Sequence, residues 1–260
     1  MPVKSCDIGQ SFLGKGCATM KIYGHRGAKG YAPENTMSSF LKAQELGADG
    51  VELDVQLTQD RQVVICHDWK IDRTSNGTGK ISALTLSALK KLDFGSWYGP
   101  QFSGEKIPTL AEFLDWFRTT DLEANIEIKN GLIIYPGIEK EVLKLIEKFQ
   151  VGERVFISSF YHPSLKLIKE MNPYMRTGAL FACRPVNPLI FCRETGADFL
   201  HPHWESVDAP WVRQARIRGI QVNCYTINVY EQYLWVAKAG VDGIFSDFPD
   251  RKTCCSECQT

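Results

Sequence analysis

Short apolar runs rich in valine, isoleucine and phenylalanine alternate along the chain with longer segments of helical periodicity. We expect strands at 21–24, 51–55, 63–66, 124–128, 155–158, 176–180, 199–201, 221–225 and 243–245. We expect helices at 38–46, 109–117, 137–149, 163–171, 209–218 and 230–239. Because strands alternate with helical segments, the sheet should be parallel. At 260 residues the chain has the size of a single (β/α)8 TIM barrel, which is the α/β fold that we expect.

The second and third predicted strands lie too close in sequence to be parallel neighbours, which need a crossover of about a dozen residues. We expect them to form an antiparallel hairpin arm that rises above the barrel rim. A two-residue turn at Asp60 and Arg61 would place Asp54 opposite His67. The turn-rich segment 72–79 then opens a small insertion at the C-terminal face, where TIM barrels carry their active sites.

The composition is that of an ordinary globular protein, with 44% hydrophobic and 23% charged residues. We expect one barrel domain over residues 20–250, an N-terminal extension over 1–19 and a cysteine-rich C-terminal tail over 251–260. Lys+Arg and Asp+Glu both number 30, so the net charge is zero. A general nucleic-acid binder would need a surplus of basic residues, so we expect no nucleic-acid partner. The oligomeric state stays open.

No apolar stretch approaches the roughly 18 residues that a membrane span needs. Residues 1–20 also lack the apolar core of a signal peptide, so we expect a cytoplasmic protein. Nine cysteines are present, and an odd number argues against a complete disulfide framework. Cys255 and Cys258 have a zinc-like spacing without an obvious second pair. Cys6 and Cys17 would complete such a site, and a reduced tail is the alternative.

Acidic side chains gather on one face of two predicted strands. Strand alternation places Glu52 and Asp54 on one side, and gathers Asn125, Glu127 and Lys129 on the neighbouring strand. Buried carboxylates repel one another, and a divalent cation would relieve that repulsion. Oxygen ligands favour Mg²⁺ or Ca²⁺. The pattern alone fits equally well a set of solvated carboxylates at the rim, paired with bases such as Lys129.

Two histidines accompany these carboxylates. His25 ends the first strand at the catalytic face, and His67 ends the returning arm of the hairpin. Imidazoles have an unperturbed pKa near 6.5, so either ring can serve as an acid or as a base near neutral pH. Arg26 follows the first histidine, and a guanidinium binds two phosphate oxygens in a fixed geometry. The set indicates acid–base chemistry beside a metal ion.

The ordered set of motifs resembles the glycerophosphodiester phosphodiesterase family from about residue 20 to residue 249. The pieces are His25-Arg26-Gly27, Glu34-Asn35-Thr36, Glu52-Leu53-Asp54, His67-Asp68 and Ile126-Glu127-Ile128-Lys129. The resemblance implies hydrolysis of small glycerophosphodiesters to sn-glycerol 3-phosphate and an alcohol. It also implies that His25 and His67 are the acid and base, and that Glu52, Asp54 and Glu127 hold one divalent ion, Mg²⁺ or Ca²⁺.

Further residues are expected to bind the substrate. Arg26 and Lys129 would hold the phosphate. Four aromatic side chains are expected at the pocket, with the alternative that some of them are ordinary core residues; they are Phe160, His203, Trp204 and Tyr225.

Three residues are expected to support their neighbours. Glu34 would orient groups around it, and Asn35 or Thr36 would equally well cap the following helix. Asp68 follows His67, so on an extended strand its side chain would face away from the pocket.

Two other functions are weighed. A phospholipase D-like barrel acting on lysophospholipids shares the histidines and carboxylates, but generally lacks the arginine found here as Arg26. A non-catalytic barrel that binds a phosphoester would not need every motif position to be filled, as it is here.

Overall fold

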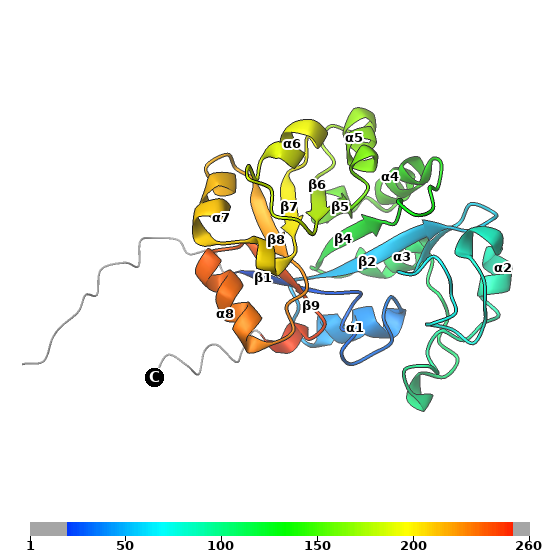
Figure 1. Cartoon of the computed structure of the whole chain (residues 1–260). Helices are drawn as coiled ribbons and strands as arrows, with labels where there is room; N and C mark the ends of the chain where they lie inside the picture. Colours follow the sequence, from blue (N-terminus) through cyan, green and yellow to red (C-terminus); the bar gives the residue numbers. More distant parts are fainter. Residues whose placement is uncertain (1–19, 252–260) are drawn as a thin grey trace, which may run out of the picture.

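Eight parallel strands close into a barrel, and helices pack around the outside (Figure 1). The structure is a computed structural model that describes residues 20–251. The barrel strands are β1 (Lys21–Gly24), β2 (Gly50–Leu57), β4 (Glu123–Ile128), β5 (Val155–Ser159), β6 (Thr177–Phe181), β7 (Phe199–Pro202), β8 (Gln221–Cys224) and β9 (Gly243–Ser246). Each pairs with the next in parallel, and β1 pairs with both β9 and β2, which closes the barrel. The predicted TIM barrel is confirmed.

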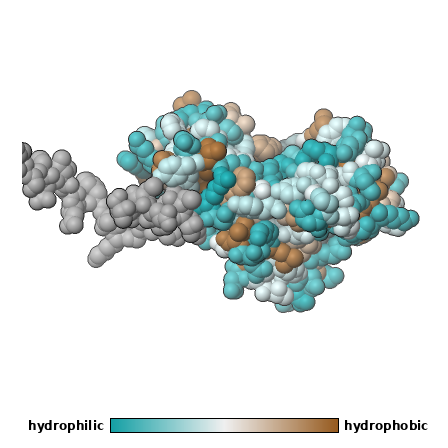
Figure 2. Space-filling model, turned by 90° about the horizontal axis from the view of Figure 1, so that it is seen from below, coloured by the Kyte–Doolittle hydropathy of each residue, from teal (hydrophilic) through white to brown (hydrophobic). Residues whose placement is uncertain are grey.

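The outer layer follows the predicted alternation. Its helices are α1 (Met37–Glu45), α3 (Leu110–Phe117), α4 (Ile138–Phe149), α5 (His162–Met171), α6 (Ile190–Thr195), α7 (Ala209–Arg216) and α8 (Tyr230–Ala239). Helix α6 was not predicted, because it is too short to show a helical period and follows a segment interrupted by prolines. No helix within residues 20–251 is long and apolar enough to cross a bilayer. The surface seen in Figure 2 is mainly hydrophilic, with scattered hydrophobic patches.

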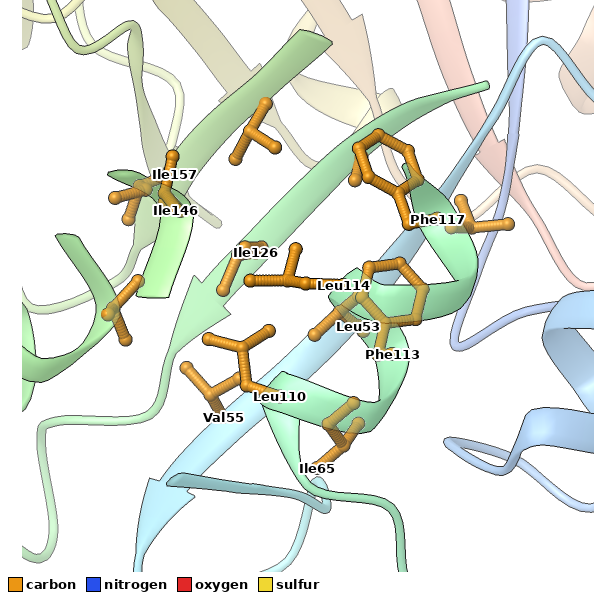
Figure 3. Packing of buried hydrophobic residues seen from close by; sticks show 14 of the residues in the cluster. Leu53, Val55, Ile65, Leu110, Phe113, Leu114, Phe117, Ile126, Ile146 and Ile157 are labelled. Atoms are coloured by element: carbon orange, nitrogen blue, oxygen red, sulfur yellow. The ribbon is translucent and has the colours of Figure 1, made fainter. Parts of the chain in front are cut away.

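Helix α3 shows how the sequence builds this layer. Its N-cap, Thr109, accepts a hydrogen bond from the backbone N–H of Glu112, and the Glu112 carboxylate accepts one from the backbone N–H of Thr109. Four apolar side chains then lie on one face and pack against the outward faces of β2 and β4 (Figure 3). They are Leu110, Phe113, Leu114 and Phe117. The opposite faces of the same strands are therefore left to the barrel interior.

The hairpin arm is present, but its predicted register is wrong by one residue. Strand β3 (Val63–Ile65) pairs antiparallel with β2, and Val55 lies opposite Ile65. Continuing this register places Asp54 opposite Cys66, whose backbone N–H donates to the Asp54 carbonyl at 2.9 Å. The loop has three residues, because Arg61 adopts a positive φ of 59°. His67 thus lies beyond the paired strand.

The predicted insertion follows β3. It holds the short helices η1 (Ile81–Ala83), α2 (Leu86–Leu89) and η2 (Pro100–Phe102). It has a small apolar core of its own, formed by Ile71, Ile81, Leu89, Phe94 and Ile107, that packs against the outer side of β3. The N-terminal extension over 1–19 and the tail after residue 251, with the cysteines considered for zinc, lie outside the described residues.

The turn of the arm gives a first prediction. Replacing Arg61 by glycine should raise the free energy of unfolding by about 0.5 kcal/mol, because a left-handed conformation costs an L-residue about 1–2 kcal/mol, and glycine gives back part of this gain as chain entropy. Urea denaturation would measure it. The exposed Gln62 has no positive φ, so Gln62→Gly is the matched control and should lower stability. A loss of stability in Arg61→Gly would contradict the prediction.

Candidate active site

The C-terminal ends of the barrel strands and the hairpin arm enclose a cavity of about 270 Å³. Its lining brings together most of the residues predicted from the sequence. They are His25, Arg26, Glu52, His67, Asn125, Glu127, Lys129, Phe160, Leu180, Tyr225, Thr226 and Phe245. Segments far apart in the chain therefore meet at one site, as the parallel barrel requires.

Three carboxylates lie at the floor of the site. Glu52 and Asp54 share a face of β2, and Glu127 lies directly across from Asp54 on β4. One oxygen from each lies within 4.8 Å of the others. Burial, and then the charges of Asp54 and Glu127, raise the pKa of Glu52. Burial also raises the pKa of Glu127, although the charge of Lys129 opposes it.

Asp54 behaves differently from its two neighbours. Burial there is outweighed by the charges of Lys129 and Arg26, which hold the pKa of Asp54 below its usual range. Asn35 donates through Nδ2 to Asp54 Oδ2 at 2.8 Å. Lys129 donates through Nζ to a Glu127 oxygen at 2.7 Å. Each of these contacts engages one oxygen of a carboxylate, and such buried oxygen donors suit a hard divalent cation.

The loop after β1 explains the spacing of the first motif. Arg26 and Asn35 both adopt positive φ, of 55° and 58°, which is uncommon for residues with a side chain. In this conformation the Arg26 backbone N–H donates to Glu52 Oε2 at 2.7 Å. A Cβ on Gly27 would lie 2.3 Å from Ser39 Oγ, so only glycine fits there. The loop is thereby folded tightly against the carboxylates.

Thr36, and not Asn35, caps helix α1. Thr36 is the N-cap of α1, and its Oγ1 accepts from the Ser39 backbone N–H at 3.3 Å. Asn35 instead binds Asp54 through both its amide oxygen and its amide nitrogen. Asn35 therefore belongs to the site.

A chain of ion pairs runs from the first motif to the second histidine. Arg26 donates to Glu34 Oε1 at 2.7 Å, and Arg73 donates to both Glu34 oxygens at 2.7 and 2.9 Å. Arg73 also donates through Nε to Asp68 at 2.7 Å. Burial acts to raise the pKa of Asp68, but hydrogen bonds with Arg73 and His67 outweigh it and lower this pKa to about 2. Sequence reasoning missed Arg73, which lies in the turn-rich segment of the insertion.

The Asp68 side chain does not point to the side opposite His67, where strand alternation would have placed it. His67 Nδ1 lies 2.7 Å from Asp68 Oδ1. The reason is that β3 ends at Ile65 and the chain bends at His67, so strand alternation no longer applies.

His25 is held in a similar way by a residue that the sequence reasoning missed. Its Nδ1 lies 2.7 Å from Asp247 Oδ1, directly after β9. Asn228 donates to the other Asp247 oxygen at 2.8 Å, and Lys29 lies 3.5 Å from the first. Burial lowers the pKa of His25, although the hydrogen bond with Asp247 opposes this. The only signal for Asp247 was its position at the catalytic end of the last strand.

The four predicted aromatic residues divide into two pairs. Phe160 and Tyr225 line the cavity, with ring centroids 5.8 Å apart. His203 and Trp204 are not among the described residues that line it, contrary to expectation. The His203 ring lies against Tyr225, at 5.7 Å between centroids, and Trp204 packs on an apolar cluster of the outer barrel. Strand β7 ends at Pro202, a parallel bridge then pairs His203 with Tyr225, and the short helix η4 (Trp204–Ser206) follows.

A TIM barrel whose catalytic face combines a carboxylate cluster with two histidines is the architecture of a metal-dependent hydrolase. The glycerophosphoryl diester phosphodiesterase family matches residues 25–251 of this chain. A glycerophosphodiester phosphodiesterase of Caldanaerobacter subterraneus is 42% identical, over 88% of this chain and 94% of its own length. One of Bacillus subtilis is 35% identical, over 87% and 83%.

A solved structure is similar as well. It is a phosphodiesterase of Oleispira antarctica in complex with the product sn-glycerol-3-phosphate, with a TM-score of 0.84 and 30% identity. The alignment covers 91% of this chain and 96% of that one. The chain belongs to the glycerophosphoryl diester phosphodiesterase family. The family, fold and enzyme class predicted from the motifs are confirmed.

The raised pKa of Glu52 gives a second prediction. Its folded-state pKa lies above its unfolded-state value of about 4.3, so the metal-free fold loses stability as the pH rises past that value. In a chelator, Glu52→Gln should therefore melt at a higher temperature than the wild type at pH 8. The difference should shrink as the pH falls toward 5. A difference that does not change with pH would contradict this account.

Proposed function

We propose that the protein hydrolyses glycerophosphodiesters to sn-glycerol 3-phosphate and an alcohol, with His25 and His67 as the acid–base pair. The observation that carries the proposal is that both imidazoles reach one cavity whose floor is the carboxylate cluster. The solved relative from Oleispira antarctica, bound to sn-glycerol-3-phosphate, supports the same product.

We assign one divalent ion, Mg²⁺ or Ca²⁺, to Glu52, Asp54 and Glu127. When bound, such an ion supplies charge stabilisation to a phosphoryl oxygen and acidifies a hydroxyl beside it. The fit rests on the donor set, because the buried Glu52 and Asp54 and the partly buried Glu127, with oxygens within 4.8 Å of one another, would otherwise repel. Asn35 and Lys129 orient two of the three by hydrogen bonds.

Two cations are proposed to bind the phosphate. Arg26 and Lys129 both line the cavity, and their side chains are 13% and 18% exposed. Arg26 is held by Glu34 and Lys129 by Glu127, and each also lies near Asp54, at 3.5 and 3.4 Å. The remaining donors of each cation are then available to phosphate oxygens. Because both cations are largely shielded from water, their charges act strongly on the negative charge that develops on the phosphate.

The proton transfers are divided between the two histidines. Burial lowers the pKa of His25, which favours a neutral ring ready to take a proton from the attacking hydroxyl, whether from glycerol C2 or from water. The His67 side chain is more exposed than that of His25, at 32% against 15%, and we assign it the proton given to the departing alcohol. A carboxylate at Nδ1 of each ring leaves Nε2 for the transfer.

The departing alcohol is proposed to leave past Phe160 and Tyr225, whose rings form an aromatic edge of the cavity. Aromatic faces attract quaternary ammonium groups, so choline esters should be good substrates.

The metal assignment gives a third prediction. Glu127→Ala should abolish turnover of glycerophosphocholine and the rise in melting temperature on adding Mg²⁺ or Ca²⁺, because too few charged ligands remain. Glu147, an exposed carboxylate on α4, provides the matched control Glu147→Ala, which should keep both. Normal turnover and normal metal stabilisation in Glu127→Ala would overturn the three-carboxylate site. Lysophosphatidylcholine, assayed in parallel, identifies a phospholipase D-like preference if it is turned over faster.

The histidine assignment gives a fourth prediction. His25→Ala and His67→Ala should each lower kcat by roughly 10²–10⁴, the usual loss for a general acid or base. A nitrophenyl ester has a leaving group that needs little protonation. It should therefore recover most of the activity of His67→Ala and little of that of His25→Ala. Recovery of His25→Ala instead would reverse the two roles, and equal recovery would show that they are not divided.

A further inference from the structure

The backbone of His67 is not held by the hairpin that leads to it. The last hydrogen bond of the antiparallel ladder joins Cys66 N–H to the Asp54 carbonyl. Among residues 20–251, neither His67 nor Asp68 takes part in a backbone-to-backbone hydrogen bond. A catalytic ring on such a bend needs another support, because a misplacement of about 1 Å costs roughly 100-fold in rate.

That support comes from one buried amide. Gln56 lies on β2 two residues after Asp54, so strand alternation puts its side chain on the same face as the carboxylates. It is 1% exposed. Its Nε2 donates to the carbonyl oxygens of Cys66, His67 and Asp68, at 2.7, 3.2 and 2.8 Å. A single side chain thus binds three consecutive carbonyls around the bend.

The orientation of this amide is fixed from its other side. Tyr135 Oη donates to Gln56 Oε1 at 2.6 Å, so the amide oxygen faces the hydroxyl and its nitrogen faces the carbonyls. Burial raises the pKa of Tyr135 above its usual range, and the hydroxyl therefore keeps the proton that it donates. Asn130 accepts from the Tyr135 backbone N–H at 2.8 Å. Asn130 in turn donates to Glu139 at 3.0 Å, at the start of α4.

We propose that Gln56, held by Tyr135, is a positioning residue that fixes the backbone of His67 for proton transfer. Neither Gln56 nor Tyr135 is among the described residues that line the cavity, so neither contacts the substrate there. The Asp68–Arg73 pair orients the imidazole ring, whereas Gln56 sets the place from which that ring extends. This inference rests on the proposed role of His67.

The test is a double-variant cycle with Gln56→Met, which keeps the side-chain length and removes the amide. With glycerophosphocholine, kcat should fall roughly 10- to 100-fold while KM changes little, because only the proton transfer is misplaced. In the His67→Ala background the same change should cost no more than about twofold. An equal loss in both backgrounds would mean general weakening of the fold, and no loss in the wild-type background would mean no positioning. Either result overturns the proposal.

Controls separate positioning from folding. Gln59 is exposed on the same hairpin, and Gln59→Met should leave kcat unchanged. Gln56→Met removes the amide donor of three carbonyls and can fail to fold, which circular dichroism would detect. In that case the double-variant cycle is repeated with Tyr135→Phe, because this change removes only the hydroxyl that orients Gln56. Tyr174→Phe, at a tyrosine that is 93% exposed, is its control.

A measurement without substrate distinguishes failure of this inference from failure of the proposed function. In NMR spectra of the imidazole signals, Gln56→Met, or Tyr135→Phe where the former does not fold, should shift those of His67 and leave those of His25 unchanged. If the wild type turns over no glycerophosphodiester, the proposed function fails, and these spectra still test the positioning. Unchanged His67 signals would overturn it.

Discussion

Repulsion among three carboxylates inside the barrel mouth is the constraint around which the site is organised. Burial alone would drive Glu52, Asp54 and Glu127 toward their neutral forms. Lys129, directly after β4, and Arg26, on the loop after β1, supply the opposing positive charges. That loop must adopt a positive φ to bring its backbone N–H to Glu52. The cations that balance the cluster are the same groups that we propose bind the phosphate.

The sequence predicts the barrel and the carboxylate face well, because both follow from local periodicity. Alternation along β2 and β4 depends only on neighbouring residues, and Glu52 and Glu127 lie where it places them. The predicted register of the arm was wrong because the register depends on the backbone conformation of Arg61. The residue type alone does not indicate the positive φ that this arginine adopts. Helix α6 was not predicted because its six residues are too few to show a helical repeat of apolar positions.

The supports of the histidines could not be predicted for a different reason. Asp247 and Arg73 reach the site from loops that no periodicity describes, and long stretches of chain separate Asp247 from His25 and Arg73 from Glu34. Gln56 was visible as the next residue on the acidic face of β2, but its role depends on a bend that begins where the strand ends. Such contacts form only when the chain folds, so the order of residues along the chain does not indicate them.

The two histidines have separate acidic supports, and this has a consequence for how the enzyme can change. The support of His25 comes from the loop after β9, through Asp247 and Asn228, while that of His67 comes from the insertion after β3. No described hydrogen bond joins Asp247 to Asp68 or Arg73. Substitutions in one loop alone can therefore exchange the carboxylate that binds one imidazole and leave the hydrogen bond of the other imidazole in place. The hydrogen-bonding partners of the two rings can thus be changed one at a time, by selection or by design.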